Sequence, residues 1–230
     1  QTKLQAMQKA VNSFIDSVAG QKDGNDPVAH KIGIVKFSGE KSDSIGNNTY
    51  EEGFLPPQIY NYTQVLKGLT DVTTGAKQLK NSVNSLKAAG CTSADYGMEK
   101  AADILKDRKG DDAKRPAVVI MFTDGEPNRD SGYDKAVAGA AVKAAKGLKD
   151  KGIKVYTIGM FAKADPSDTS TSNKFNQYMH GVSSNYPNAA KGNNSSGVNL
   201  GARASGNYYF AAANAGELDK IFQRISQEVS

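Results

Sequence analysis

A short apolar run that stops abruptly constrains the fold of this chain more than any other feature. Residues 117–122 are all apolar and several are β-branched, and Thr123 to Pro127 then supply turn-forming residues. A run of this length and composition, bounded by turn residues, predicts a strand that is buried on both faces. Strands of this kind lie in the middle of parallel sheets, where ligands bind at the carboxyl ends of the strands. Asp124 is expected at such an end, so we predict that this edge of the sheet carries the function.

The rest of the chain alternates between two apolar patterns. Spacings of three and four residues predict amphipathic helices, and shorter apolar stretches predict strands. The predicted helices cover residues 2–18, 72–90, 94–105, 132–151, 173–182 and 214–229. The predicted strands, besides the central one, cover residues 29–38, 153–159 and 207–212. This order predicts an α/β fold in which a doubly wound, mainly parallel sheet carries helices on both faces.

We expect a single domain over residues 1–230, with two long insertions. Residues 39–70 are irregular, and two prolines within residues 53–60 allow at best an edge strand or a hairpin arm there. Residues 162–206 are rich in Ser, Asn, Asp, Gly and Pro. Loops of this length in a compact domain are usually functional or mobile. Neither an internal repeat nor a domain linker is evident.

Composition and motifs exclude several classes of function. The net charge is +5, but the lysines are scattered along predicted helices, which indicates solvated helix faces and no nucleic-acid partner. Cys91 is the only cysteine, so we expect no internal disulfide and no cysteine-based metal site. His30 and His180 have no motif around them, and a structural role is expected for both. We find no phosphate-binding loop, nucleophile elbow or His-Glu-x-x-His motif, so we expect no enzyme. No signal peptide, anchor or membrane-spanning run is visible, so we expect no direct membrane insertion.

Two polar clusters are expected to converge at the carboxyl edge of the sheet. Thr92 and Ser93 lie in the turn before a predicted helix, and Asp124 with Gly125 and Glu126 follows the central strand. A hydroxyl and a carboxylate are hard oxygen ligands, which suit Mg²⁺, Mn²⁺ or Ca²⁺ better than zinc or copper. Each cluster alone has a simpler interpretation, as a helix cap or a turn. Their occurrence together in this strand and helix order favours a metal site.

The same residues carry a resemblance to a known family. The segments 119–127 and 90–101, which contain Thr-Asp-Gly and Gly-Cys-Thr-Ser, resemble the von Willebrand factor type A domain. That family carries a metal-ion-dependent adhesion site on a Rossmann-like sheet. Its pattern has an Asp-x-Ser-x-Ser loop after the first strand, a threonine in a Gly-Gly-Thr-like turn, and an aspartate in Thr-Asp-Gly. Thr92 matches the threonine and Asp124 the aspartate, which implies Mg²⁺ (or Mn²⁺ or Ca²⁺) held partly by these two residues.

The resemblance covers nearly the whole chain. Residues 154–159 resemble the family's next strand, and residues 207–218 resemble its last strand and helix. Residues 183–188 and the long insertions resemble versions found in surface and pilus-tip proteins of Gram-positive bacteria. The resemblance therefore implies an extracellular, cell-surface or cell-wall location, in a larger multidomain protein that lies outside the membrane.

The implied function is adhesion, in which the cation bridges the domain to a carboxylate of a protein ligand. The implied ligands include proteins of a host extracellular matrix or cell surface. The insertions at 39–70 and 162–206 are candidates for ligand contact by position. Candidate ligand-binding residues around the metal are Ser93, Gly125, Glu126 and Arg129, and Glu126 and Arg129 are equally consistent with an ordinary surface role.

Two departures from the family pattern bear on the site. Cys91 replaces a glycine, which we expect to be tolerated. No Asp-x-Ser-x-Ser is present, and the chain opens in what resembles the helix after that motif, so the first, central strand is also missing. Three explanations remain open: truncation at the N-terminus, which we favour, a strand supplied by another chain, or loss of the metal site.

Removal of a central strand has a structural cost. It leaves a groove of unpaired backbone groups and exposed apolar surface, so we expect the chain alone to be poorly stable. The alternative to the adhesion function is a structural pilus or surface scaffold without a competent metal site.

Overall fold

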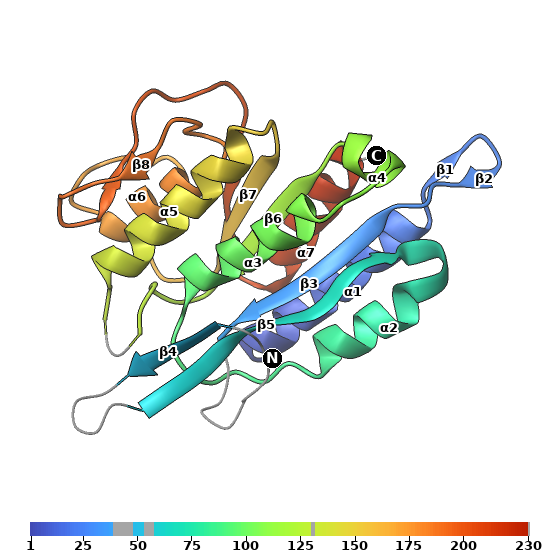
Figure 1. Ribbon diagram of the computed structural model, residues 1–230, viewed down its shortest axis with the longest axis horizontal. Coiled ribbons are helices and arrows are strands. Elements are labelled where there is room, and N and C mark those ends of the chain that lie inside the picture. The colour runs from blue at the N-terminus through green and yellow to red at the C-terminus, as the bar shows by residue number, and fades with distance from the viewer. Residues whose placement is uncertain (39–47, 53–57, 130–131, 230) are drawn as a thin grey trace.

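The computed structural model describes residues 1–38, 48–52, 58–129 and 132–229 (Figure 1). Helices pack on both faces of a layer of β-strands, and three strands of this layer form a parallel sheet. The predicted fold class, a Rossmann-like α/β fold, is confirmed.

The β-layer consists of two three-stranded halves. One half is parallel, with the order β10-β7-β6, and the other is antiparallel, with the order β3-β5-β4. The parallel strands are β6 (Val118–Thr123), β7 (Lys154–Gly159) and β10 (Tyr209–Ala211). The antiparallel strands are β3 (Lys31–Phe37), β4 (Asn48–Glu52) and β5 (Gln58–Asp71). Two short hairpins lie outside the layer: β1 (Lys22–Asp23) with β2 (Asp26–Pro27), and β8 (Ala190–Lys191) with β9 (Val198–Asn199).

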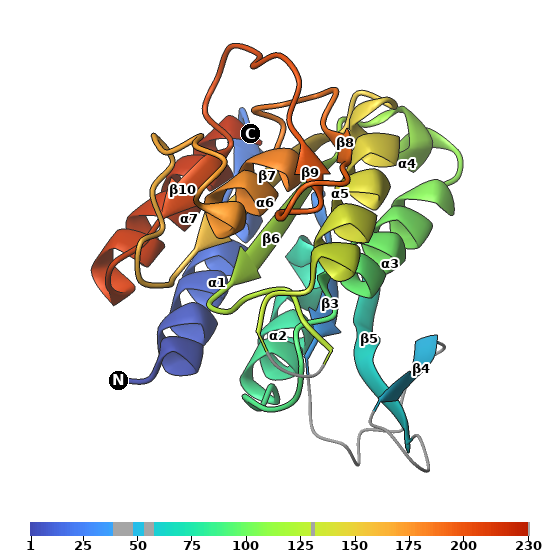
Figure 2. The same ribbon diagram turned by 90° about the vertical axis from the view of Figure 1, so that its left-hand side faces the viewer.

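Each face of the layer has its own helices and its own apolar core (Figure 2). One face carries α1 (Lys3–Ala19), α2 (Val72–Asn84) and α7 (Ala215–Glu228). The other carries α3 (Ala94–Lys106), α5 (Lys135–Lys149) and α6 (Lys174–Val182), and α4 (Asp111–Lys114) is a single turn before β6. Small residues of α5, such as Ala138 and Ala141, are completely buried. They let this helix approach its neighbours closely, as the alanine-rich pattern predicted.

Helix starts follow the capping signals of the sequence. Thr2 and Gln5 form a capping box at α1, because the Thr2 hydroxyl accepts the Gln5 N–H and the Gln5 side chain accepts the Thr2 N–H. Asn214 caps α7 by accepting the Glu217 N–H at 3.0 Å, and the Glu217 carboxylate accepts the N–H of Ala213. The predicted start of the last helix is thereby confirmed.

Two segments differ from the prediction. The helix α2 ends at Asn84, before the expected end at residue 90. The long strand β5 covers residues 58–71, of which residues 58–70 were expected as part of an irregular arm. It pairs with β3 on one side and β4 on the other. This strand is held by backbone pairing on both edges. The mixed polar and apolar side chains of the segment did not predict this pairing. The remainder of the predicted arm, residues 39–47 and 53–57, lies outside the described residues.

The central apolar run forms the strand β6, as predicted, but it is less buried than expected. Only Met121 and Thr123 are buried in β6, whereas β7 is buried at every position after Lys154. The reason is a cavity of about 930 Å³ that lies between β6 and β3. The cavity agrees with the groove expected from a missing central strand.

Candidate metal centre

Thr92 and the turn after β6 lie against each other at the carboxyl edge of the sheet. A Cβ atom placed on Gly125 would lie 3.5 Å from the Oγ1 atom of Thr92. The backbone of Thr92 is clamped by Asn128, whose N–H donates to the Thr92 carbonyl at 3.0 Å and whose Oδ1 accepts the Thr92 N–H at 3.2 Å. The structure therefore brings together the two sequence segments that were expected to converge.

The strand end fixes the backbone on either side of Asp124. The Thr123 carbonyl accepts the Met160 N–H at 2.9 Å, so pairing with β7 continues up to this residue. The Thr123 hydroxyl donates to the Gly125 carbonyl at 3.0 Å and lies 3.3 Å from the Gly125 N–H, which closes a tight turn. Asp124 is thus the first residue beyond the paired strand. Its side chain is 54% exposed, so its carboxylate oxygens are accessible to a ligand.

A lysine from the start of α1 lies close to Asp124. The Nζ atom of Lys3 lies 3.9 Å from Oδ2 of Asp124, and both side chains are about half exposed. An exposed pair at this distance contributes little and is screened by salt. The pair therefore leaves the Asp124 carboxylate available to another cation.

The residues present fit part of a hard-cation site. Thr92 supplies a hydroxyl oxygen and Asp124 a carboxylate oxygen, which are the donor types that Mg²⁺ and Mn²⁺ take in proteins. Mg²⁺ is commonly held by one or two protein carboxylates, with waters completing its octahedral shell. Within residues 1–38, 48–52, 58–129 and 132–229, no group of three or more His, Cys, Asp or Glu side chains could hold a metal ion. Among the described residues, Thr92 and Asp124 are therefore two donors of a site that needs more.

Ser93, proposed as a ligand contact, lies in the interior. Ser93 is completely buried, and its backbone N–H donates to the Phe37 carbonyl at 2.9 Å. Ser93 occupies the N-cap position of α3, but its side chain makes no capping hydrogen bond. Its role in this structure is to join the turn before α3 to the end of β3.

Arg129, the second candidate on the rim, pairs inside the protein. Its Nη2 atom lies 2.5 Å from Oδ2 of Asp95, and its guanidinium lies 4.5 Å from the centre of the Tyr96 ring. Burial raises the pKa of the Asp95 carboxyl, and the charge of Arg129 opposes that rise. The pair therefore anchors the segment after the metal-site turn to the first turn of α3. Glu126 is half-buried next to this turn.

Sequence reasoning missed Asp95, Asn128 and Lys3 at this site. Asp95 and Arg129 are 34 positions apart, and Thr92 and Asn128 are 36 apart. No local pattern reports such pairings. The sequence gave one indication of a role for Asp95, which is its position in the first turn of a predicted helix. A carboxylate at such a position is also favoured by the helix dipole, so the indication was not specific.

In the part of the chain that the structure describes, no helix combines the length and the apolar character that a membrane crossing requires.

Comparison with known proteins supports the fold. The pilus adhesin SpaC from Lactobacillus rhamnosus GG, in its open conformation, is similar to this chain with a TM-score of 0.62 and 16% identity. The PilB minor pilin from Streptococcus sanguinis is similar with a TM-score of 0.58 and 15% identity. The alignments cover 99% and 100% of this chain, but only 28% of SpaC and 54% of PilB. No curated protein matches the sequence. A sequence model of the von Willebrand factor type A domain matches residues 1–224, and the chain belongs to this family.

Proposed function

We propose that this domain is an adhesion module that binds a protein ligand through a divalent cation. The observation that supports this most directly is the contact of Thr92 with the Asp124–Gly125 turn at the carboxyl edge of the sheet. In the proposed site, Mg²⁺ or Mn²⁺, or alternatively Ca²⁺, is held in part by the Thr92 hydroxyl and the Asp124 carboxylate. When bound, the ion supplies an electrophilic centre for a carboxylate of the ligand.

The roles of the protein groups follow from their positions. Asp124 holds the cation and neutralises part of its charge, and Thr92 contributes a neutral oxygen on the other side. The Asn128 clamp fixes the distance between the two loops, so that the donors need no rearrangement on binding. Glu126 adjusts the charge beside the site. The remaining donors are waters and, in our proposal, an Asp-x-Ser-x-Ser segment of the kind found in the family.

The family and the structural relatives support the proposed setting. Two of the solved structures similar to this chain are a pilus adhesin and a minor pilin, and this chain spans only a part of each. We propose that the chain is one domain of a larger protein at a bacterial cell surface or cell wall, with residues 39–70 and 162–206 as insertions of that domain. The proposed partner is a protein with an accessible carboxylate, such as a host matrix or cell-surface protein, and the proposed activity is binding without catalysis.

A structural scaffold without a competent metal site is the second candidate. The small number of metal donors favours this candidate. Among the described residues, only Thr92 and Asp124 match oxygen-donor positions of the family pattern at this turn. In that case the domain holds its neighbours in a surface structure, and the carboxyl edge has no ligand.

The two candidates differ in the response of the protein to Mn²⁺. The paramagnetic ion broadens NMR signals of nearby nuclei, so titration is expected to broaden the amide signals of Thr92 and Gly125 before those of other residues. Asp124→Ala is expected to remove this selective broadening. Asp111→Ala, which removes a side chain that is 97% exposed, serves as the matched control and is expected to leave it unchanged. Equal broadening of these signals in the wild type and in Asp124→Ala would support the scaffold function.

A further inference from the structure

Asn185 is a completely buried residue that joins three parts of the chain. Its backbone N–H donates to the Ser183 hydroxyl at 3.2 Å, which fixes it to the end of α6. Its carbonyl accepts the N–H of Ala204 at 2.8 Å, and its Oδ1 atom accepts the N–H of Tyr208 at 2.7 Å. Tyr208 directly precedes β10, and its own carbonyl accepts the Thr157 N–H of β7. Asn185 therefore holds the segment that leads into β10.

The segment held in this way lies open to solvent. Residues 201–207 are exposed except for Ala204, which is half-buried. They form a loop on the outside of the molecule between β9 and β10 (Figure 2). A loop with few buried contacts opens at a low cost in free energy. The hydrogen bonds to Asn185 are therefore important for the position of this loop.

The orientation of the Asn185 amide is fixed by its partners. The backbone N–H of Tyr208 only donates, so the amide oxygen faces it and the amide nitrogen faces the other way. There, Nδ2 of Asn185 lies 3.2 Å from Nδ1 of His180. Because Nδ2 only donates, Nδ1 of His180 accepts, and the neutral ring carries its hydrogen on Nε2. These three residues, here called the amide clamp, are satisfied together only while His180 is neutral.

The surroundings of His180 keep its ring neutral. The residue is completely buried, and the rings of Tyr186 and Tyr209 lie edge-on to it, with centroids at 5.3 and 5.0 Å. Burial lowers the pKa of His180, and the positive charge of Arg203 lowers it further. Nearby backbone groups and the Asp168 carboxylate oppose this shift, and the resulting pKa is about 4. The clamped state therefore takes up a proton only in strong acid.

We propose that the amide clamp is an acid-sensitive switch that releases the loop of residues 201–207 and the start of β10. A proton on Nδ1 of His180 turns the acceptor of the clamp into a donor. If the amide turns over, its oxygen satisfies the imidazolium, but its nitrogen then faces the Tyr208 N–H. The amide presents a single oxygen, and the two donors lie on opposite sides of it, so one hydrogen bond is lost. The bond to the charged ring is the stronger one, so the bond to Tyr208 breaks.

Release is favoured in acid because the two states bind the proton differently. In the released state, the His180 ring is free to charge near its ordinary value of 6.5, whereas in the clamped state it charges only near pH 4. The clamp is therefore fully stable above pH 6.5. Below that pH, the released fraction grows by at most about tenfold per pH unit, which is the slope for uptake of one proton. This proposal does not rest on metal binding and is tested in the presence of a chelator.

Native-state hydrogen exchange tests the switch. The Tyr208 amide reports on the clamp, and the amide of Ile158, a completely buried residue of β7, reports on unfolding of the whole domain. Protection of Tyr208, corrected for the intrinsic effect of pH, is expected to fall by up to about tenfold from pH 6.5 to 5.5. Low concentrations of urea are expected to accelerate exchange at Ile158 but not at Tyr208, because a local opening exposes little surface.

Variants identify the group that titrates. His180→Gln is expected to abolish the pH dependence at Tyr208, whereas His30→Gln, which removes the other histidine, is the matched control and is expected to retain it. Asn185→Asp replaces the amide with a carboxylate, which accepts from both the imidazolium and the Tyr208 N–H. This variant is expected to reverse the effect, so that Tyr208 is better protected at pH 5.5 than at 6.5. A merely structural role of Asn185 would not reverse the sign.

Three outcomes would overturn the proposal. Protection of Tyr208 that does not change between pH 6.5 and 5.5 would show that the clamp does not respond to His180. A pH dependence that persists in His180→Gln would assign the effect to carboxyl groups such as Asp168. Equal urea dependence at Tyr208 and Ile158 would show that the clamp opens only when the whole domain unfolds. The first and third outcomes come from the wild-type protein, so the proposal remains testable even where a variant fails to fold.

Discussion

The guanidinium of Arg129 and the carboxylate of Asp95 form an ion pair with an N–O distance of 2.5 Å beside the turn that carries Asp124. The Asp95 side chain is only 5% exposed and that of Arg129 27%. Removal of the arginine would therefore leave a buried carboxylate without its cation. The pair links the loop after β6 to α3, and it explains why a residue predicted for the ligand-binding rim points inward.

Arg129→Ala is expected to lower the free energy of unfolding by about 3–5 kcal/mol at neutral pH, as is typical when one partner of a buried pair is removed. The loss is expected to shrink at acidic pH. Burial raises the pKa of the Asp95 carboxyl, so the folded variant binds a proton more tightly than the unfolded chain does. Stability of the variant relative to wild type therefore recovers as the pH falls through the carboxyl range. Urea denaturation at several pH values measures both effects.

The control for this prediction is the double variant Asp95→Asn with Arg129→Ala, which has no buried charge. It is expected to regain part of the stability at neutral pH and to lose the pH dependence of the single variant. A single variant as stable as wild type at neutral pH would show that the ion pair has no structural role.

His180 is expected to make the fold sensitive to acid. It is completely buried, and burial together with the charge of Arg203 lowers its pKa to about 4. Its Nδ1 atom lies 3.2 Å from Nδ2 of Asn185, whose Oδ1 accepts the Tyr208 N–H, so Nδ1 is the acceptor. Protonation at Nδ1 would place two donors against each other.

The unfolded chain takes up this proton near pH 6.5, but the folded chain only near pH 4. Stability is therefore complete above pH 6.5 and is lost as the pH falls towards 4, by at most about 3 kcal/mol. His180→Gln is expected to remove this component between pH 6.5 and 5, above the range of most carboxyl groups. His30 is retained in both proteins, so the difference belongs to His180. Parallel stability profiles for wild type and variant would contradict the prediction.

Lys149 is expected to be one of the more important polar residues for stability. Its Nζ atom donates to the carbonyls of Gly181, Ser183 and Tyr186 at 2.8, 3.1 and 2.9 Å, and so joins α5 to the end of α6. Lys149→Met keeps the apolar stem but leaves these carbonyls without the ammonium, and it is expected to cost about 2–4 kcal/mol. Lys146→Met, which breaks a more exposed pair on the same helix, is expected to cost less than about 1 kcal/mol. Equal midpoints of thermal unfolding for both variants would refute the role of Lys149.

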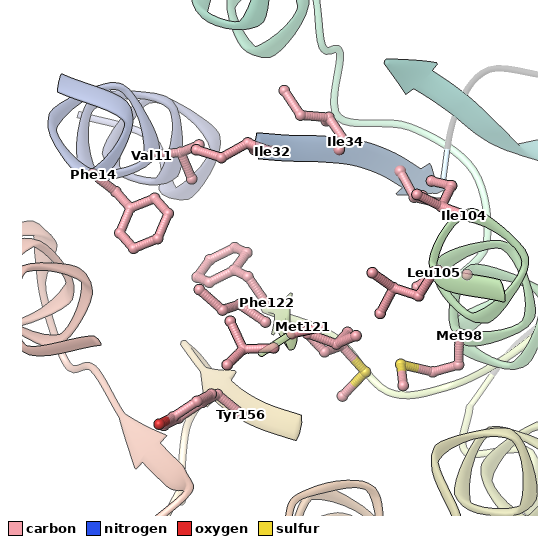
Figure 3. A pocket seen from close by; sticks show the side chains of 18 of the residues that line it. Val11, Phe14, Ile32, Ile34, Met98, Ile104, Leu105, Met121, Phe122 and Tyr156 are labelled. Carbon is pink, nitrogen blue, oxygen red and sulfur yellow. The ribbon is translucent and has the colours of Figure 1, made fainter. Parts of the chain in front are cut away.

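The chain alone is expected to be poorly stable, because the cavity between β3 and β6 exposes two strand edges and apolar side chains on both faces (Figure 3). We expect a free energy of unfolding below the range of about 5–15 kcal/mol that is usual for domains, measured by urea denaturation. A version of the chain extended upstream by the family's first strand is expected to have a higher free energy of unfolding. A monomer whose stability lies within or above the usual range, and does not change in the extended version, would show that the cavity between β3 and β6 costs little stability.

The parts of the fold that were predicted correctly have strong local patterns. The helices α1 and α7 have apolar residues at helical spacing and a capping residue at the start, and β6 and β7 are compact apolar runs. The strand β5 was missed, because its structure depends on backbone pairing with β3 and β4 and not on the alternation of its side chains.

The candidate site was predicted in part for the same reason. Thr92 and Asp124 lie at the ends of recognisable elements, and the topology of the fold brings these ends together. The contacts that hold the site, from Asn128 to Thr92 and from Arg129 to Asp95, join residues that are distant in sequence. Side-chain pairing over such separations becomes visible only in three dimensions.

Calorimetric titration with Mn²⁺ and Mg²⁺ tests the proposed metal site most directly. Three proteins are compared: the present chain, a version in which a strand ending in Asp-x-Ser-x-Ser precedes Gln1, and Asp124→Ala in that longer version. We predict tight binding only by the longer wild-type form, because its added segment supplies the metal donors that the site lacks when only Thr92 and Asp124 are present. If the longer form binds neither ion, or binds equally well without Asp124, the domain shares the fold of the family without its metal site, and the scaffold function replaces the adhesion function.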